Sequence, residues 1–474
     1  MTTVVLNGAD LTLADLELVA RGGAKVALAP QALERMARSR ALVEHAAEAG
    51  TPTYGLTTGL GVQKRVRQER DDAGFGRRQI AESRAGVGPE APPDVVRAAM
   101  AVLLNQMAGG STCMRPALAE RLAQALNDGL RPFVRLRGSL GASDLAAMAD
   151  IAHGVFGGTE LAAGEGLALI NSSAFGTGLA ALALADAARL VDAADAAGAL
   201  CLEGFAANLA VLHPAIERFR PDPVLARTLT RLRELLRGSY LWDEDVARNL
   251  QDPLTYRSTA PIQAMARRAL EHALELLAFE LNAAQGNPLV SVEDGRILSS
   301  SIYEVAGLAA ALDYVRVALA TMLSAASERG VKLLDTAWSG LPTGLLPEGG
   351  PDLGLSILAI TAQSLAAEAA ALAQPVSFLV TSTCGAEGIE DRASHLPLSA
   401  RRLSELVDAG AGVVAVELVV AAQAVDVRGS APLGSGTAAA YRRVRDVVPV
   451  LRAGDVPPVD VEPVRRLILD GAFI

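Results

Sequence analysis

A glycine-rich segment, Gly138–Leu145, carries polar side chains that could take part in catalysis. It reads Gly-Ser-Leu-Gly-Ala-Ser-Asp-Leu and leads into an apolar stretch that starts at Leu145. Serine and aspartate are common helix N-caps, and such a cap is worth roughly 1 kcal/mol. Taken alone, the segment therefore predicts that Ser143 or Asp144 caps the following helix. A catalytic role for either residue needs support from elsewhere in the chain.

Four further segments combine acids, amides and an arginine in ways that could bind or transform a small molecule. An arginine fork suits a carboxylate, and acids or amides can hold an amine or move a proton. Taken singly, each segment is expected to be solvated surface or to satisfy a core contact. The four segments are Glu165–Asn171, Gln251–Arg257, Ser327–Arg329 and Glu387–Arg392.

The composition excludes several kinds of chemistry. The chain has 474 residues and a net charge of −10, with lysine only at Lys25, Lys64 and Lys332. There is no basic stripe for nucleic acid, and lysine is too rare to favour a phosphate-loop or Schiff-base enzyme. The five histidines show no paired spacing, so we expect no metal site. Any catalysis must therefore come from a source other than Lys, Cys, His or a metal.

Helices are the elements that must position these residues. The chain is 51% hydrophobic but only 4% aromatic, and its Ala-rich runs suit closely packed helices rather than strands. A strand candidate at Thr2–Leu6, a helix at Leu11–Ala20 and an irregular glycine-rich loop at Thr53–Gly61 come first. Helices of unusual length follow and predict an elongated bundle. They cover Ala260–Ala284, Ile302–Lys332, Ser356–Ala373 and Ala400–Val427.

Cysteine usage and apolar runs predict a soluble cytoplasmic protein. Cys113, Cys201 and Cys384 are few and well separated, as expected of reduced residues that mostly fill the core. The first residues contain acids and no basic leader, so we expect no signal peptide. The most apolar later stretch, Val413–Val425, is interrupted by Glu417 and is too short and polar to predict a membrane span.

Taken in order, the polar segments resemble the histidine and aromatic amino-acid ammonia-lyase family, which also contains aminomutases. The resemblance runs from about Thr53 to Arg428, and seven collinear matches are far more specific than any one of them. The matches are Tyr54-Gly55-x-x-Thr58-Gly59-x-Gly61, Gly138–Leu145, Glu165–Asn171, Gln251-Asp252-Pro253 with Arg257, Asn287-Pro288-Leu289-Val290, Ser327-Glu328-Arg329 and Glu390-Asp391.

The resemblance implies a fold and an assembly. The fold is expected to be mainly α, an ammonia-lyase-like elongated central helical bundle with a small mixed N-terminal domain. Residues 1–180 would form the mixed domain with the catalytic loop, and residues 181–474 the long-helix bundle. The family assembles as a homotetramer whose active sites draw loops from more than one subunit, which agrees with helices too long for an ordinary monomer.

The resemblance also implies roles for residues. In the family an Ala-Ser-Gly tripeptide cyclises to a methylidene-imidazolone, an electrophile that activates the amine as a leaving group. The corresponding residues here are Ala142-Ser143-Asp144. By position, Tyr54 would remove the β-proton, Arg257 would bind the substrate carboxylate, Asn171 and Gln251 would support electrophile and substrate, and Glu390 would accept from the amine or polarise it.

The chain departs from the family at the chemistry. Asp144 stands where the ring-forming tripeptide has glycine, whose lack of a Cβ permits the compressed backbone that cyclisation needs. Leu254 replaces a second tyrosine, which removes a group able to move protons. The scaffold therefore matches the family better than the reaction centre does.

The expected substrate pocket also differs. Ser83 stands where relatives often carry His, Phe or Leu, which removes the usual basis for naming a substrate. Arg84 adds a cation beside the pocket or on an ordinary surface. Tyr303 brings a phenol where the family has another pattern, Gly-Asn-Phe-His.

Three hypotheses follow, and we favour the first. It is an enzyme on this fold without the ring, which catalyses elimination, addition or cyclisation of a small carboxylate or amino-acid-derived substrate. A better leaving group than an amine would make the electrophile unnecessary. The second is an ammonia-lyase or 2,3-aminomutase that uses a self-formed methylidene-imidazolone. The third is a catalytically silent paralogue that acts as an assembly partner. The altered centre favours specialised, natural product biosynthesis.

Overall fold

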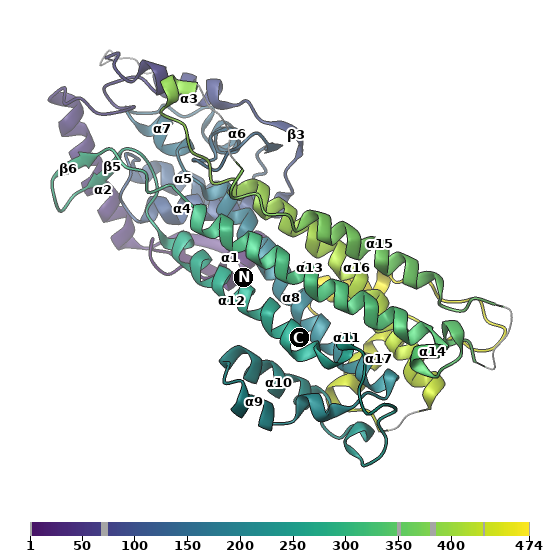
Figure 1. Cartoon of the computed structure of the whole chain (residues 1–474). Helices are drawn as coiled ribbons and strands as arrows, with labels where there is room; N and C mark the ends of the chain where they lie inside the picture. Colours follow the sequence, from purple (N-terminus) through teal and green to yellow (C-terminus); the bar gives the residue numbers. More distant parts are fainter. Residues whose placement is uncertain (1, 68–73, 348–351, 380–384, 430–431, 474) are drawn as a thin grey trace. The chain divides into compact units, whose positions relative to one another are not determined.

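The computed structural model describes residues 2–67, 74–347, 352–379, 385–429 and 432–473 (Figure 1). The chain divides into two compact units. The first unit comprises Met1–Ala183, Ala273–Leu312 and Pro375–Arg401, and the second comprises Leu184–His272, Asp313–Gln374 and Arg402–Ile474. Both are mainly helical, which confirms the predicted fold class. The division into domains at residue 180 stays a prediction.

The first unit contains short strand pairs and helices of moderate length. Strands β1 and β2 pair in parallel, with Thr3 opposite Lys25, whereas β3–β4 and β5–β6 are antiparallel. Its elements are β1 (Thr3–Leu6), α1 (Leu13–Ala20), β2 (Lys25–Leu28), α2 (Pro30–Glu48), α3 (Phe75–Ser83), β3 (Val87–Glu90), α4 (Pro93–Ala108), α5 (Pro116–Asn127), β4 (Arg135–Arg137), α6 (Leu145–Phe156), α7 (Glu165–Ile170), β5 (Leu289–Ser291) and β6 (Arg296–Leu298).

Local sequence signals explain how these elements begin. The strand and the helix expected near the start of the chain are both present, and the Thr12 hydroxyl caps α1 by accepting from the Asp15 N–H at 3.1 Å. Helices α4 and α5 each begin at a proline, because proline tolerates the first helical turn, where its missing N–H costs nothing.

The longest helices have residues in both units. They are α8 (Ala174–Phe205), α12 (Thr259–Asn282), α13 (Ala306–Leu334) and α16 (Leu396–Arg428). The second unit also contains α9 (Ala215–Phe219), α10 (Pro223–Leu235), α11 (Leu254–Arg257), α14 (Thr336–Ser339), α15 (Ile357–Leu372), α17 (Ser435–Arg445) and α18 (Glu462–Leu469). The four predicted long helices are present as α12, α13, α15 and α16, and two of them start several residues away from the expected position. Helix α16 starts at Leu396 rather than Ala400. Helix α13 starts at Ala306 rather than Ile302, which leaves Tyr303 in the preceding loop.

Polar side chains buried in the second unit join its helices. Arg329 of α13 donates to Glu417 of α16 at 2.6 Å, and both side chains are almost fully buried. Arg316 of α13 donates to the Leu372 carbonyl at the end of α15 at 2.5 Å, and the three helices lie side by side (Figure 1). Two of the cysteines, Cys113 and Cys201, are buried free thiols, while Cys384 lies outside the described residues.

Three helices in the described ranges have the length and composition to cross a membrane. Their apolar windows lie in Glu165–Phe205, Ala306–Leu334 and Leu396–Arg428. The expectation drawn from Val413–Val425 alone was wrong on length, because α16 continues through Glu417, whose buried carboxylate pairs with Arg329 of α13. In the structure, 94%, 61% and 89% of these windows are buried, so the protein itself covers most of their apolar surface.

Candidate active site

A cavity of about 370 Å³ in the first unit collects most of the predicted site residues. Tyr54, Ala142, Asn171, Tyr303 and Glu390 line it, although they come from segments far apart in the sequence. No Lys, Arg or His occurs among the residues that are described as lining it. The remaining lining residues are Leu60, Gly61, Val62, Gln79, Glu82, Ser83, Leu145, Leu167, Ile170 and Asn287.

The Tyr54 phenol lies in the turn after α2. Its oxygen accepts a hydrogen bond from the Gly61 N–H at 3.1 Å, and the neighbouring Gly55 has a φ of 69°, in the left-handed region that favours glycine. Burial raises the pKa of Tyr54, the Gly61 N–H lowers it, and the negative charge of Glu390 raises it further. These surroundings together favour the neutral phenol of Tyr54 over the phenolate.

A second phenol, Tyr303, shares this environment. Burial is the main cause that raises the pKa of Tyr303, and the charges of Glu390, Tyr54 and Glu304 add to it. Tyr303 lies in the loop between β6 and α13, and its carbonyl accepts from the Ser173 hydroxyl at 3.0 Å. The two phenols thus face a common carboxylate, Glu390, which is exposed.

The Ala142–Asp144 turn is held by contacts on both sides. Ser143 has a positive φ of 61°, which is uncommon for a residue with a Cβ. Its hydroxyl donates to the Asn171 side-chain oxygen, and the Asn171 amide donates to the Asn287 carbonyl at 2.8 Å. Asn171 therefore contacts the turn that the resemblance assigned it to support.

Asp144 is fully buried at the N-cap position of α6, but its side chain does not cap this helix. Its carboxylate accepts from the Ser139 hydroxyl at 2.5 Å and from the Gly176 N–H at 2.6 Å. Burial raises the pKa of Asp144 to about 6, although these two hydrogen bonds lower it. The expected capping role is wrong, because both carboxylate oxygens bond groups outside the first turn of α6.

The residues present do not fit the methylidene-imidazolone ring. Cyclisation would join the amide nitrogen of Asp144 to the carbonyl carbon of Ala142. In the structure this N–H instead donates to the Ser172 carbonyl at 2.8 Å, and the carboxylate is fixed by two hydrogen bonds. Ring closure would break the backbone hydrogen bond and move a buried, pinned side chain, whereas glycine would have no side chain to move.

Two predicted pocket residues on α3 and just after it have different positions. Ser83 lines the cavity, and its hydroxyl donates to the Gln79 carbonyl at 2.8 Å. Arg84 does not line the cavity, because its guanidinium donates to the buried carboxylate of Asp150 at 2.9 Å. The expectation that Arg84 binds substrate is therefore corrected: it forms an ion pair with Asp150.

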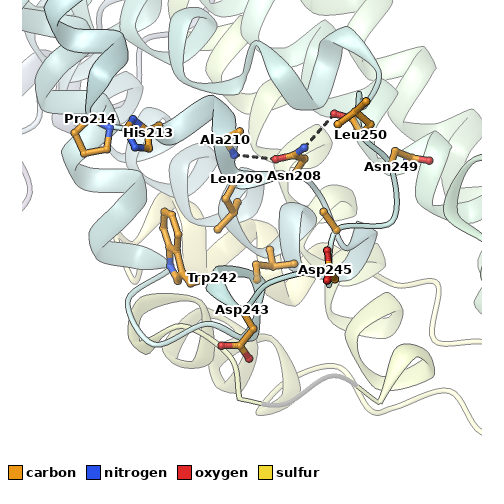
Figure 2. A pocket seen from close by; sticks show the side chains of 12 residues that line it. Asn208, Leu209, Ala210, His213, Pro214, Trp242, Asp243, Asp245, Asn249 and Leu250 are labelled. Carbon is orange, nitrogen blue, oxygen red and sulfur yellow. Dashed lines mark hydrogen bonds between the residues drawn. The ribbon is translucent and has the colours of Figure 1, made fainter.

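Gln251, Leu254 and Arg257 belong to the second unit. Figure 2 shows a pocket whose lining residues lie between Asn208 and Leu250, just before these three in the sequence. Its volume is about 470 Å³, and in it the Asn208 side chain donates to the Leu250 carbonyl at 3.0 Å. The Asn208 N–H also donates to Asp252 at 2.7 Å, and the Asp252 carbonyl accepts from Arg257 at 2.7 Å. Asp252 thus fixes the loop at both ends.

The neighbours of Arg257 in this loop have opposite environments. Leu254 is 65% exposed. Tyr256 is fully buried, stacks on Phe205 and donates to the Arg329 carbonyl at 2.8 Å. The Tyr256 phenol is therefore engaged inside the core and does not substitute for the family tyrosine that Leu254 replaces.

Gln79, Glu82 and Asn287 line the cavity but were missed as site residues. Gln79 lies one helical turn before Ser83, so the i, i+4 spacing on α3 could have revealed it. Glu82 is adjacent to Ser83, and Asn287 belongs to a segment that was matched without a role. The side-chain nitrogen of Gln79 is buried and has no hydrogen-bond partner among the described residues.

The fold and this cavity define a mainly helical enzyme whose reactive groups are phenols, carboxylates and amides. A sequence model described as "Aromatic amino acid lyase" matches residues 11–163 and 158–446. The chain belongs to this family and is a carbon–nitrogen lyase type of enzyme.

Individual relatives span essentially the whole chain. Histidine ammonia-lyase of Symbiobacterium thermophilum is 34% identical, covering 98% of this chain and 97% of its own, and that of Anaeromyxobacter dehalogenans is 35% identical, covering 100% of both. Among solved structures, ergothionase from Treponema denticola, an ergothioneine-degrading enzyme, has a TM-score of 0.93 at 26% identity and covers 100% and 99% of the two chains. Tyrosine aminomutase from Streptomyces globisporus has a TM-score of 0.91 at 29% identity, with coverage of 100% and 98%.

Proposed function

We propose that this lyase works without the methylidene-imidazolone ring and eliminates a tertiary amine from a small carboxylate substrate that carries a quaternary ammonium group. The observation that carries the proposal is Asp144. Its backbone N–H donates a hydrogen bond to the Ser172 carbonyl, and its buried carboxylate accepts hydrogen bonds from Ser139 and Gly176. Ring formation in the family instead uses a glycine at this position, which has no side chain to hold in place.

The leaving group explains why a ring is unnecessary. A primary amine is a poor leaving group and needs an electrophile to activate it. A quaternary ammonium group leaves as a neutral tertiary amine and needs neither a proton nor a covalent bond to the enzyme. Tyr54 takes the β-proton, the C–H electrons form the double bond, and the C–N electrons depart with the amine.

The charge of the cavity supports a cationic substrate. Glu82 and Glu390 supply carboxylates, and the rings of Tyr54 and Tyr303 can face a quaternary ammonium group. Burial and Glu390 both disfavour the Tyr54 phenolate, which is the form that acts as a base. A bound cation opposes both effects, because a nearby positive charge lowers the pKa of a phenol. The substrate itself would therefore activate the base.

Carboxylate recognition is assigned to Arg257. The first-unit cavity has no lining cation among its described residues, so we propose that a second copy of the chain supplies the loop with Gln251, Leu254 and Arg257. The exposed Leu250 and Leu254 would be covered in such an assembly, a homotetramer with shared active sites. We further propose that the protein is soluble and cytoplasmic and binds neither nucleic acid nor membrane.

Two measurements test this function. The intact mass of the purified protein should equal the encoded mass, because no ring forms. Ergothioneine, a trimethylammonium amino acid, is the first substrate to assay, with L-histidine and L-tyrosine as controls. We expect release of trimethylamine and an α,β-unsaturated acid from the betaine, and no ammonia from the free amino acids.

The alternatives give different results. The first alternative is an ammonia-lyase or 2,3-aminomutase that uses the ring, and it is supported by the similarity to histidine ammonia-lyases and a tyrosine aminomutase. It would show a mass lower by two waters and would release ammonia from, or rearrange, an α-amino acid. A silent assembly partner would bind relatives of this chain and turn over neither kind of substrate. Either result would overturn the proposal.

A further inference from the structure

A further cavity of the first unit, distinct from the candidate active site, is lined by four cationic side chains. It has a volume of about 310 Å³ and lies in the first unit, where α1 and α5 end and β2 begins. Arg21, Lys25, Arg97 and Arg131 line it. We propose that this cavity binds a phosphate-type dianion, either inorganic phosphate or the phosphate group of a small phosphomonoester.

The positive charge of this cavity is not balanced by acids. Arg21 pairs with Asp94 at 2.9 Å and with Glu17 at 3.5 Å. Lys25, Arg97 and Arg131 form no ion pair within the described ranges, although the chain as a whole carries a net charge of −10. Three cations therefore surround one cavity without a carboxylate partner.

Helix ends compensate only part of this charge. Arg97 donates to the Val19 carbonyl at 2.9 Å and to the Leu126 carbonyl at 3.1 Å, and Lys25 donates to the Asn127 carbonyl. Each helix C-terminus is equivalent to about half a negative charge, so the ends of α1 and α5 together contribute about −1. Against three unpaired cations, an excess of about +2 remains, which matches the charge of a phosphate dianion.

Arg131 is the residue that distinguishes a ligand-binding site from a set of cations that only cap helix ends. Arg97 and Lys25 bond helix-end carbonyls and would be retained for that reason alone. Arg131 is exposed, lines the cavity, and makes no hydrogen bond to a carbonyl or acid in the part of the chain that the structure describes. Burial lowers the pKa of Arg97, and the like charge of Arg131 lowers it further. A bound anion would relieve this repulsion and use the free donors of the Arg131 fork.

The test is a thermal-shift titration of the full-length protein with phosphate against potassium chloride at equal ionic strength. A matched pair of variants removes one positive charge each: Arg131→Gln at the cavity and Arg38→Gln on α2. Arg38 is exposed and forms no ion pair with any described residue. Both side chains are exposed and form no ion pair with a described residue, so the unfolding temperature without ligand should be similar in all three proteins.

We expect phosphate to raise the unfolding temperature in a saturable manner that chloride does not reproduce. Arg131→Gln should weaken phosphate binding roughly tenfold, since hydrogen bonds to charged groups contribute about that much, whereas Arg38→Gln should bind like the wild type. A parallel titration with glucose 6-phosphate shows whether the rest of the cavity is used. Equal effects of phosphate and chloride, or full phosphate binding by Arg131→Gln, would overturn the proposal.

Discussion

Replacing Tyr54 with Phe removes a single oxygen atom, and the structure lets its effects on stability and on catalysis be separated. Among the described residues, the phenol oxygen accepts a hydrogen bond from the Gly61 N–H alone, at 3.1 Å, and the phenylalanine ring keeps almost the same volume. The loss of one such hydrogen bond costs about 1 kcal/mol. Loss of a general base lowers the rate by about 100- to 10,000-fold. The variant should therefore stay folded and lose almost all activity.

The assay measures kcat and KM for amine release, together with the free energy of unfolding in urea. Tyr303→Phe is the matched control, because it makes the same change at the other phenol that faces Glu390. For the wild type, kcat/KM should rise with pH through neutrality, because the raised pKa of Tyr54 keeps most of the free enzyme protonated. Full activity in Tyr54→Phe, with activity lost in Tyr303→Phe, would show that the base is misassigned.

Three further predictions concern charged groups. Glu390→Gln removes a charge that raises the pKa of Tyr54, so the rise of kcat/KM should move to lower pH; an unmoved profile would contradict the coupling. Burial raises the pKa of Asp144 from 3.8 to about 6, so the stability it contributes is present below about pH 4 and is lost as pH rises through 6. In Asp144→Asn the free energy of unfolding should no longer fall by about 3 kcal/mol between about pH 4 and pH 6, as measured by urea unfolding at several pH values. Arg329→Met leaves Glu417 buried without its partner and should cost about 3–5 kcal/mol, and the double variant with Glu417→Leu should recover most of this loss.

Much of the site was accessible to sequence reasoning because the motifs keep their order along the chain. Tyr54, Asn171, Tyr303 and Glu390 were selected before any geometry was known, and all four line one cavity. The role of each in catalysis stays a prediction. Arg84 was assigned incorrectly because nothing in the sequence indicates that Asp150, far along the chain, is its partner.

Asp144 shows a different limit. The sequence reveals that a glycine is missing and that an aspartate precedes an apolar helix, which is also the pattern of an N-cap. Only the fold brings the Ser139 hydroxyl and the Gly176 N–H to its carboxylate. These contacts show that the side chain does not cap α6, and they fix the carboxylate that ring closure would have to move. The local sequence pattern reveals neither point.

The sequence by itself determined the helical class, the long helices and the family, because helical hydrogen bonds and apolar periodicity are local and collinear motifs survive divergence. The tertiary structure alone decided which polar groups meet. It paired Glu417 with Arg329 and placed Tyr303 before α13 rather than in it. It also gathered around one cavity three cations that have no ion-pair partner among the described residues. Such contacts join residues distant in the chain, and they depend on how helices pack rather than on the residues of any one segment.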